Sequence, residues 1–528
     1  MLMKHSKLNV ELLLAGILSL ILIIVILLFC DANVMHYTRY MDSDIASETL
    51  LAQVLSENGF KIPDTWYGST AKRIISAPDL AALIYLITDN LNISMGLACA
   101  VMTVLLAVSM ISFYKNVGFN ALEIVVAVMI PYMLSRSVSN SLKIIFLYAS
   151  YYVSHFIVYF IILTLYSQAL KNGLKKKHVI LGVVLAVING MQGMHGILFI
   201  YLPLLCTEMI RVGIKIITRM KVKRDGFISL WSFVLVVVSY ISVRLNGSYE
   251  QSPSRNIRHS IEKLITDIFP DIVETMDLSG FNLNVLWIFI ILGGLGYAIL
   301  IICLIKNIIE ENVNASVDNQ MWALIPIIFA FLVPVVSSMF TTAESTGRYY
   351  IAQMFILGAG YAIFVRLLKI KIAANNITQN VLLTVIAIPV LLYGINSVSF
   401  YYENLIANDQ TDASKNMQII NWLKENDCLY GYADFLKANE ITVVSNDTVK
   451  IRALDSMTDL NGCKWLTDTR WYPPTKTTDG LTAYVLLPEE IEEFQTFLEN
   501  ENPTIVNYKV FDNLEVYILD KDYSMWVD

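Results

Sequence analysis

The sequence predicts a polytopic α-helical membrane protein of about 11 transmembrane helices, with a small α/β domain at its C-terminal end. Three observations support this fold class. Of the 528 residues, 56% are hydrophobic and only 16% are charged, a balance typical of chains whose helices lie in lipid. Apolar runs long enough to span a bilayer recur from residue 10 to residue 399. From about residue 400 the chain becomes polar, and short helical and strand-like patterns replace the long runs.

The long apolar runs predict where the chain crosses the membrane. At roughly 20 residues per helix about eleven segments qualify, and the third and fifth are the shortest. The first follows a basic N-terminus and has no small-residue cleavage site, so we expect a retained signal anchor. Segment 79–88 is too short to span and is expected to pack at the membrane face. The predicted spans are 10–30, 91–113, 120–134, 145–169, 178–191, 196–214, 227–244, 284–305, 321–340, 349–367 and 380–399.

The basic loops predict the orientation, because Lys and Arg concentrate in the cytoplasmic loops of membrane proteins. Three loops (171–178, 211–226 and 365–375) are basic, and a cytoplasmic N-terminus places all three inside. An odd number of spans then leaves the C-terminal domain outside. We therefore expect a multi-pass protein of the cell (plasma) membrane, with outside loops at 31–90, 135–143, 245–283 and 341–348.

Two domains are predicted: a transmembrane module at 1–399, which includes the first outside loop 31–90, and an extracytoplasmic α/β domain at 400–528. Cys428 and Cys463 fall in the second domain, where a disulfide is permitted, but their spacing does not decide whether they pair. Residue patterns in this domain predict helices at 412–426 and 489–500, strands at 440–446, 448–454 and 482–488, and a closing hairpin at 505–520.

The first outside loop opens with clustered carboxylates, in "DSDIASETLLAQVLSENG" (42–59). Asp44 is placed to cap a helix whose apolar spacing begins at Ile45, and Glu48 lies one turn further on. An ordinary capped helix explains this pattern as well as a functional site does. As a functional site, a carboxylate partly desolvated at a membrane surface has a raised pKa and can act as a general base. Asp42 and Asp44 could also hold a divalent cation, the only cofactor to which the sequence points.

Aromatic residues mark two further candidate surfaces. Trp66 and Tyr67 stand in "PDTWYGST", and the long loop 462–480 carries Trp471 and Tyr472. Their faces suit stacking on a sugar, although the first pair also fits an interfacial aromatic belt and the second fits packing on its own domain. The candidate acceptor or sugar contacts are Glu48, Trp66, Tyr67, Glu344, Trp471 and Tyr472.

Cations on the outer side are candidates for binding a phosphate. Arg348 begins a span from the outside, and its planar fork suits phosphate, although a helix-end Arg that snorkels to the interface is an equal alternative. The stretch "SPSRNIRHSIEK" (252–263) is basic although it is predicted to lie outside, against the positive-inside trend, which makes it a second candidate for binding phosphate. The alternative is that it is an ordinary solvated helix face. A His in the tight loop 189–196 is more often structural than functional. The candidate phosphate-binding residues are Arg348, Arg258, Arg255, His259 and His195.

The order of these parts resembles the GT-C superfamily of membrane glycosyltransferases: a first helix, a large outside loop opening on acids, many further spans and a soluble outer domain. The stretches 42–74 and 421–446 are similar to the first loop and the C-terminal domain of a bacterial branch of that superfamily. Where that branch often has an Arg, this chain has His195, which puts the phosphate-binding role of His195 in doubt.

The resemblance implies an inverting transfer of a hexosyl or pentosyl group from a polyprenyl-phosphate carrier to an extracytoplasmic glycan, lipid or cell-wall polymer. It implies that Asp42 or Asp44 is the base or ligates a metal, with Asp44 favoured for its helix-start position.

Two other functions remain open at the level of sequence. One is a polysaccharide ligase or polymerase that uses a polyprenyl-diphosphate donor. The other is a non-enzymatic flippase or transporter of a lipid-linked sugar, which would place ionisable residues deep in its spans. The predicted spans carry few ionisable residues deep within them, and Glu123 and Glu208 are both expected near cytoplasmic ends. The net charge of −7 argues against a nucleic-acid partner, and no nucleotide-binding or hydrolase motif is present.

Overall fold

The chain forms two compact units, each built from two separate stretches of sequence. Unit 1 comprises Met1–Phe29 and Met102–Tyr402, and unit 2 comprises Cys30–Val101 and Glu403–Asp528. The loop 31–90 thus shares a compact unit with the C-terminal region, a grouping that differs from the predicted division at 399/400. The structure, a computed structural model, describes residues 10–68, 74–135, 145–147, 152–220, 223–245, 254, 258–275, 280–310, 319–342, 344–371, 376–407, 412–475 and 478–527.

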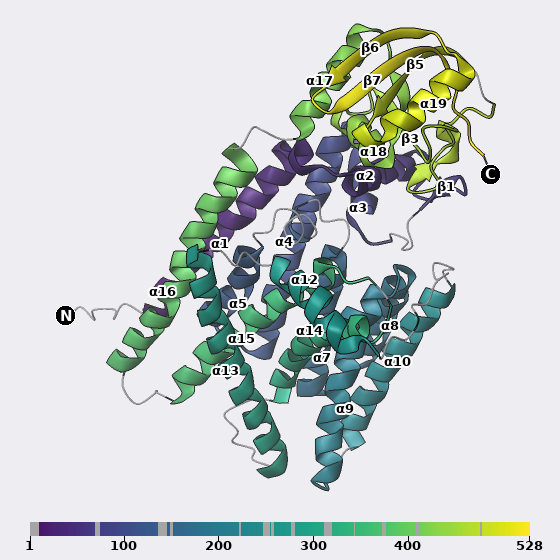
Figure 1. Cartoon of the computed structure of the whole chain (residues 1–528). Coiled ribbons are helices and arrows are strands. Elements are labelled where there is room, and N and C mark those ends of the chain that lie inside the picture. The colour runs from purple at the N-terminus through teal and green to yellow at the C-terminus, as the bar shows by residue number, and fades with distance from the viewer. Residues whose placement is uncertain are drawn as a thin grey trace. The chain divides into compact units, whose positions relative to one another are not determined.

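The secondary-structure elements of unit 1 among the described residues are all helices, and α8, α9 and α10 lie side by side within it (Figure 1). Helices α1 and α4 run on into unit 2. The helices are α1 (Val10–Met35), α4 (Leu91–Val117), α5 (Ala121–Leu134), α7 (Val153–Asn172), α8 (Lys176–Met191), η2 (Ile197–Tyr201), α9 (Leu202–Ile217), α10 (Lys223–Leu245), α11 (Ser260–Lys263), η3 (Leu264–Ile268), α12 (Phe269–Glu274), α13 (Gly280–Glu310), η4 (Asn319–Leu324), α14 (Ile325–Met339), η5 (Gly347–Tyr350), α15 (Gln353–Lys371) and α16 (Asn376–Tyr401).

These helices confirm a multi-pass membrane protein. Over the described residues, 9 helical stretches are long and apolar enough to cross a membrane, and each coincides with a predicted span. The remaining two predicted spans form shorter helices: α5 has 14 residues and α8 has 16. A capping box sets the start of α5, because Asn120 and Glu123 satisfy each other's backbone N–H groups there.

Glycines allow α13 and α15 to pack closely. A Cβ added at Gly296 would lie 2.3 Å from the carbonyl oxygen of Gly360, and one at Gly360 would lie 2.6 Å from that of Gly293. Small residues at such crossings let helix backbones approach in lipid, where burial of apolar surface drives little association. The close crossing fixes α15, the helix that follows Arg348.

The acids within the spans of unit 1 are engaged in ion pairs. Arg211 of α9 donates from Nε and Nη2 to Glu208, each at 2.8 Å, and from Nη1 to Asp225 of α10. Lys215 donates to Asp225 at 2.7 Å. Two acids and two bases therefore neutralise one another, a structural arrangement rather than a path for an ion. A second group joins Glu123 to Arg366 at 3.4 Å.

Unit 2 contains a five-stranded mixed sheet, in the order β3-β2-β5-β7-β6, that carries helices on both faces. The strands β3, β2 and β5 are parallel, and β7 and β6 continue the sheet antiparallel. Its elements are η1 (Tyr37–Tyr40), α2 (Ser43–Glu57), β1 (Trp66–Tyr67), α3 (Ala77–Thr88), η6 (Tyr402–Ala407), α17 (Asp412–Glu425), β2 (Tyr430–Asp434), α18 (Phe435–Val444), β3 (Lys450–Leu454), β4 (Thr467–Asp468), η7 (Thr469–Trp471), β5 (Thr478–Leu486), η8 (Pro488–Glu490), α19 (Ile491–Glu501), β6 (Ile505–Phe511) and β7 (Leu514–Asp522).

Alternation along the strands separates the two faces of this sheet. One face is aliphatic and includes Ala433, Ile451 and Val485 beneath α17 and α18. The other is aromatic and includes Tyr432 and Tyr484, which pair across β2 and β5 beneath α19. This aromatic face carries the second pocket described below.

Several predictions for the C-terminal region are confirmed, and one is wrong. The helices, the strands at 448–454 and 482–488, and the hairpin at 505–520 are present. The stretch 440–446 is not a strand, because it lies largely within helix α18, which Asp434 caps by accepting from the N–H of Leu436. Its β-branched residues are buried against α2 and β3, and this packing overrides their strand propensity. Cys428 and Cys463 are both buried and free.

Candidate functional site

The predicted catalytic carboxylates lie at the start of α2. Asp42 precedes the helix, and its Oδ1 accepts the N–H of Ile45 at 2.9 Å. Asp42 is thus the N-cap, and the expectation that Asp44 caps the helix is wrong. The helix begins two residues earlier than the apolar spacing indicated, because Ser43 and Asp44 already adopt helical geometry. Asp44 stands in the first turn, and both aspartates are half-buried.

Helix α2 is held rigidly, which fixes the position of its first turn. Its buried residues include Ile45, Thr49 and most of the others between Ser43 and Leu55. The hydroxyls of Tyr37 and Thr49 lie 2.6 Å apart, and Asn439 of α18 donates to the hydroxyl of Ser47 at 2.8 Å. Glu48, one turn beyond Asp44, is only 2% exposed. The predicted contact between Glu48 and a sugar is not supported by this burial.

The structure adds charged groups near Asp42 that sequence reasoning missed. Glu440 of α18 is 6% exposed, and Lys437 and Asn416 donate to it at 2.9 and 3.3 Å. Burial raises the pKa of Glu440, Lys437 opposes that shift, and the charge of Asp42 reinforces it. Arg39, in η1, donates to the carbonyl of Leu405 at 2.6 Å. Of these charged groups, only Arg39 could have been noticed in the sequence, because it stands three residues before Asp42.

A metal site with several ligands is not formed among the described residues, where no three His, Cys, Asp or Glu side chains gather as ligands would. A cation held by Asp42 and Asp44 remains a prediction. The chemistry that the start of α2 offers directly is an oriented carboxylate that can accept a proton.

The predicted aromatic contacts lie together in unit 2. Trp66 and Trp471 meet edge to face with ring centroids 5.7 Å apart, because β1 pairs with β4 just before η7. Trp66 and Tyr472 are 8% and 6% exposed, so both serve packing and offer little surface to a sugar. Tyr67 is exposed, and Trp471 is half-buried beside a pocket. For these two the sugar contact stays a prediction.

In unit 1, two of the predicted phosphate-binding residues come together. His195 precedes η2, and its ring lies 5.6 Å from that of Tyr349 in η5. Arg348 is the neighbour of Tyr349 and places its guanidinium 5.7 Å from the centre of that ring. Tyr152 and Phe199 pack against the other sides of His195, with ring centroids at 5.1 and 5.9 Å. The Arg348 guanidinium thus lies over Tyr349, one of three aromatic rings that form a cage around His195.

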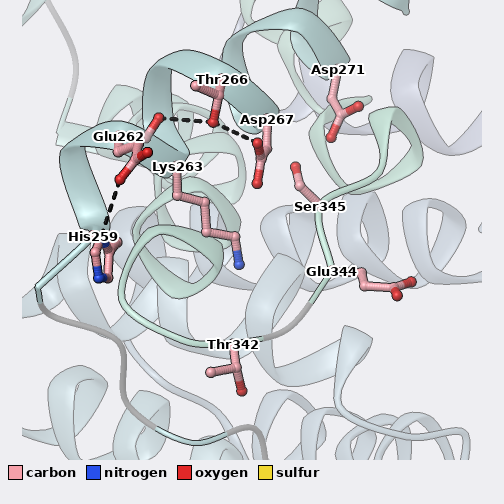
Figure 2. A pocket seen from close by; sticks show the side chains of 9 residues that line it. All are labelled: His259, Glu262, Lys263, Thr266, Asp267, Asp271, Thr342, Glu344 and Ser345. Atoms are coloured by element: carbon pink, nitrogen blue, oxygen red, sulfur yellow. Dashed lines mark hydrogen bonds and ion pairs between the residues drawn. The ribbon is translucent and has the colours of Figure 1, made fainter.

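Two of the remaining predicted residues of unit 1, His259 and Glu344, line a pocket of about 640 Å³ (Figure 2). His259 lies 3.0 Å from Glu262, and the amine of Lys263 donates to the carbonyl of Thr341 at 2.9 Å. Glu344 faces this pocket from the segment that follows α14. Arg258 precedes His259 and is exposed, whereas Arg255 lies outside the described residues.

The excess of negative charge around this pocket argues against phosphate binding there. Four carboxylates line it against one Lys and one His: Glu262, Asp267, Asp271 and Glu344. An anion is repelled by that excess of negative charge. Arg258 and His259 are therefore weaker phosphate candidates than Arg348.

Comparison with known proteins identifies the fold. No protein-family model and no curated protein sequence matches this chain. The crystal structure of ArnT from Cupriavidus metallidurans in the apo state superposes with a TM-score of 0.50 and 12% sequence identity, covering 95% of this chain and 98% of that one. The crystal structure of that ArnT bound to undecaprenyl phosphate gives a TM-score of 0.49 and 11% identity, over 95% and 97%. The match to the apo structure shows that this chain has an ArnT-like fold over nearly its whole length, which confirms the predicted GT-C-like architecture with its C-terminal α/β domain.

Proposed function

We propose that this chain is a membrane glycosyltransferase that moves a sugar from a polyprenyl-phosphate carrier to an acceptor outside the cytoplasm. The observation that carries the proposal is the oriented Asp42 carboxylate at the start of a rigid helix, seven residues after the end of α1. The ArnT-like fold supports the same reading, since the resemblance in sequence implies a first-loop acid as the catalytic base.

In the proposed reaction a carboxylate takes the proton of an acceptor hydroxyl. The hydroxyl oxygen then attacks the anomeric carbon of the donor, and the bond from that carbon to the phosphate oxygen breaks. The products are an inverted glycoside and the polyprenyl phosphate. Asp42 is the preferred base, because its hydrogen bond to Ile45 orients it, whereas Asp44 lacks the capping position expected of it.

Arg348 is the proposed contact for the donor phosphate, with His195 beside it in the aromatic cage. Arg suits this task because its fork donates two parallel hydrogen bonds to a phosphate. The proposed acceptor is an extracytoplasmic glycan, lipid or cell-wall polymer, the proposed transferred group is hexosyl or pentosyl, and the N-terminus is proposed to be cytoplasmic.

The test uses Asp42→Asn and Asp44→Asn in membranes supplied with polyprenyl-phosphate sugars. Asn still accepts a backbone N–H as an N-cap, so Asp42→Asn removes the base and keeps the helix start. Loss of a general base lowers the rate by about 10²–10⁴-fold. Asp434→Asn is the matched control, because Asp434 caps α18 in the same unit and has no proposed catalytic role.

We expect Asp42→Asn to lose transfer and Asp434→Asn to keep it, with all three variants folded. Wild-type transfer by both Asp42→Asn and Asp44→Asn would reject the base assignment. Glycan analysis of a deletion strain separates the alternatives: a missing side-branch sugar supports the transferase, and shortened polymers support a ligase or polymerase.

A further inference from the structure

Unit 2 contains a pocket of about 540 Å³ on the aromatic face of its sheet. Its walls come from the first residues of β2, β3 and β5, the last residue of β7, and the η7 turn with the residues after it. The side chains that matter below are Tyr430, Lys450, Arg452, Arg470, Trp471 and Asp522.

Arg452 is the unusual member of this lining. It stands on β3 opposite Tyr432, among the aromatic side chains of that face, and is only 5% exposed. Its guanidinium carbon lies 4.1 Å from the ring centroid of Trp471, a close cation–π contact. Residues of this kind are rarely buried unless an anion pairs with them.

The buried charge of Arg452 is only partly compensated. Its Nε and Nη1 atoms are shielded from solvent and have no hydrogen-bond partner within the described part of the chain. The nearest carboxylate is that of Asp447, 3.8 Å from Nη2, too far for a hydrogen bond. Desolvation lowers the pKa of Arg452. An anion near the guanidinium would remove this deficit.

The other charges of the pocket do not supply that anion. Asp522 accepts from Tyr432 and from the N–H of Ser524, both at 2.8 Å, and burial raises the pKa of its carboxyl. Asp479 is exposed, where water screens its charge. Arg470 forms an ion pair with Asp468 at 2.6 Å. The side chain of Lys450 is half exposed. The interior of the pocket therefore remains electropositive.

We propose that this pocket binds a saccharide that carries an anionic group, either a carboxylate or a phosphate, with the anion near Arg452 and the sugar ring beside Trp471 and Tyr430. Aromatic side chains next to a charged planar group suit a ring that is apolar on its face and polar at its edge. The proposal concerns binding alone, so it stands apart from the transferase activity.

Replacement of Arg452 by Met separates a binding role from a structural one. A buried cation without good partners contributes little to stability, so a hydrophobic side chain of similar length is tolerated or stabilising. Met cannot attract an anion. Lys509→Met is the matched control, because Lys509 also lies over an aromatic ring in unit 2, that of Phe511, and is not among the residues lining the pocket.

The experiment titrates the full-length protein in lipid nanodiscs with D-glucuronate, glucose 6-phosphate and glucose, at constant ionic strength, by ligand-observed NMR. Tighter binding of glucuronate than of glucose, by about tenfold or more, supports a carboxylate ligand, and the same preference for glucose 6-phosphate supports a phosphate ligand. In either case Arg452→Met abolishes the preference and leaves the thermal midpoint unchanged or higher, and Lys509→Met keeps the preference.

Equal affinity for all three sugars, or no binding of any, overturns the proposal. So does a preference for anions that survives Arg452→Met. A large fall in the thermal midpoint of Arg452→Met also counts against it, because Arg452 would then be a structural residue.

Discussion

The two units treat buried charge in opposite ways. In unit 1, Arg211 is fully buried and has three hydrogen bonds to two acids. In unit 2, Arg452 is nearly as buried, yet two of its nitrogen atoms lack partners within the described residues. Charged side chains within a membrane must be neutralised by other residues of the protein, whereas a charged side chain in a pocket outside the membrane can be neutralised by a ligand. Complete pairing therefore indicates a structural role, and incomplete pairing indicates a binding site.

Loss of Arg211 should give the largest effect on stability. Arg211→Met leaves Glu208 and Asp225 buried without their main cation, and breaking such a pair costs about 3–5 kcal/mol. Thermal unfolding in detergent measures the change. Lys215→Met should cost much less, because Lys215 is partly exposed and leaves Arg211 in place. Equal losses of stability in Arg211→Met and Lys215→Met would mean that Arg211 is no more important to this ion-pair group than Lys215.

Loss of Arg470 should give a smaller, pH-dependent effect in unit 2. Burial favours a raised pKa for Asp468, but hydrogen bonds from Arg470 outweigh it and hold that pKa below its usual value. The pair therefore stabilises the fold above about pH 4, the ordinary pKa of Asp, and this contribution is lost as pH falls through the lowered pKa.

Arg470→Met should destabilise by about 1–3 kcal/mol at pH 7, because a buried carboxylate loses its charged donor. The difference from wild type should shrink towards pH 3 in thermal unfolding scans. A difference independent of pH would mean that the side chain of Arg470 acts by packing.

Removal of the Asp42 cap of α2 should lower stability by an amount near the middle of the usual range for helix N-caps. Asp42→Ala removes the bond to the N–H of Ile45 and should cost about 1 kcal/mol, while Asp42→Asn should cost less. Asp44→Ala should be milder than Asp42→Ala, since Asp44 is not the cap. The reverse order in thermal unfolding would restore Asp44 as the capping residue.

The smallest predicted effect concerns Glu490 before α19. Burial raises its pKa to about 7, so the folded state binds a proton more readily than the unfolded state does. Its contribution is fully favourable below about pH 4 and declines as pH rises to 7. Glu490→Gln should keep the bond to the N–H of Leu487 and gain less than about 1 kcal/mol at pH 8, with no gain at pH 4. A gain of equal size at both pH values would exclude titration as the cause.

The candidate site was only partly predictable from sequence. The spacing of Asp42 and Asp44 marked the start of a helix, but which of them caps the helix depends on where helical backbone geometry begins. Glu440 could not be foreseen, because it lies almost 400 residues from Asp42 along the chain. Arg452 looked like an ordinary strand residue until its neighbours were known.

The sequence by itself determined the membrane class, the positions of most spans and the closing hairpin, because long apolar runs and short-range periodicity act locally. Only the tertiary structure decided that the first loop joins the C-terminal region in one compact unit and that 440–446 is helical. It alone also decided that Arg211 is fully paired and that Arg452 is only partly paired. The physical reason is that burial and pairing depend on neighbours distant in sequence, which no local pattern encodes.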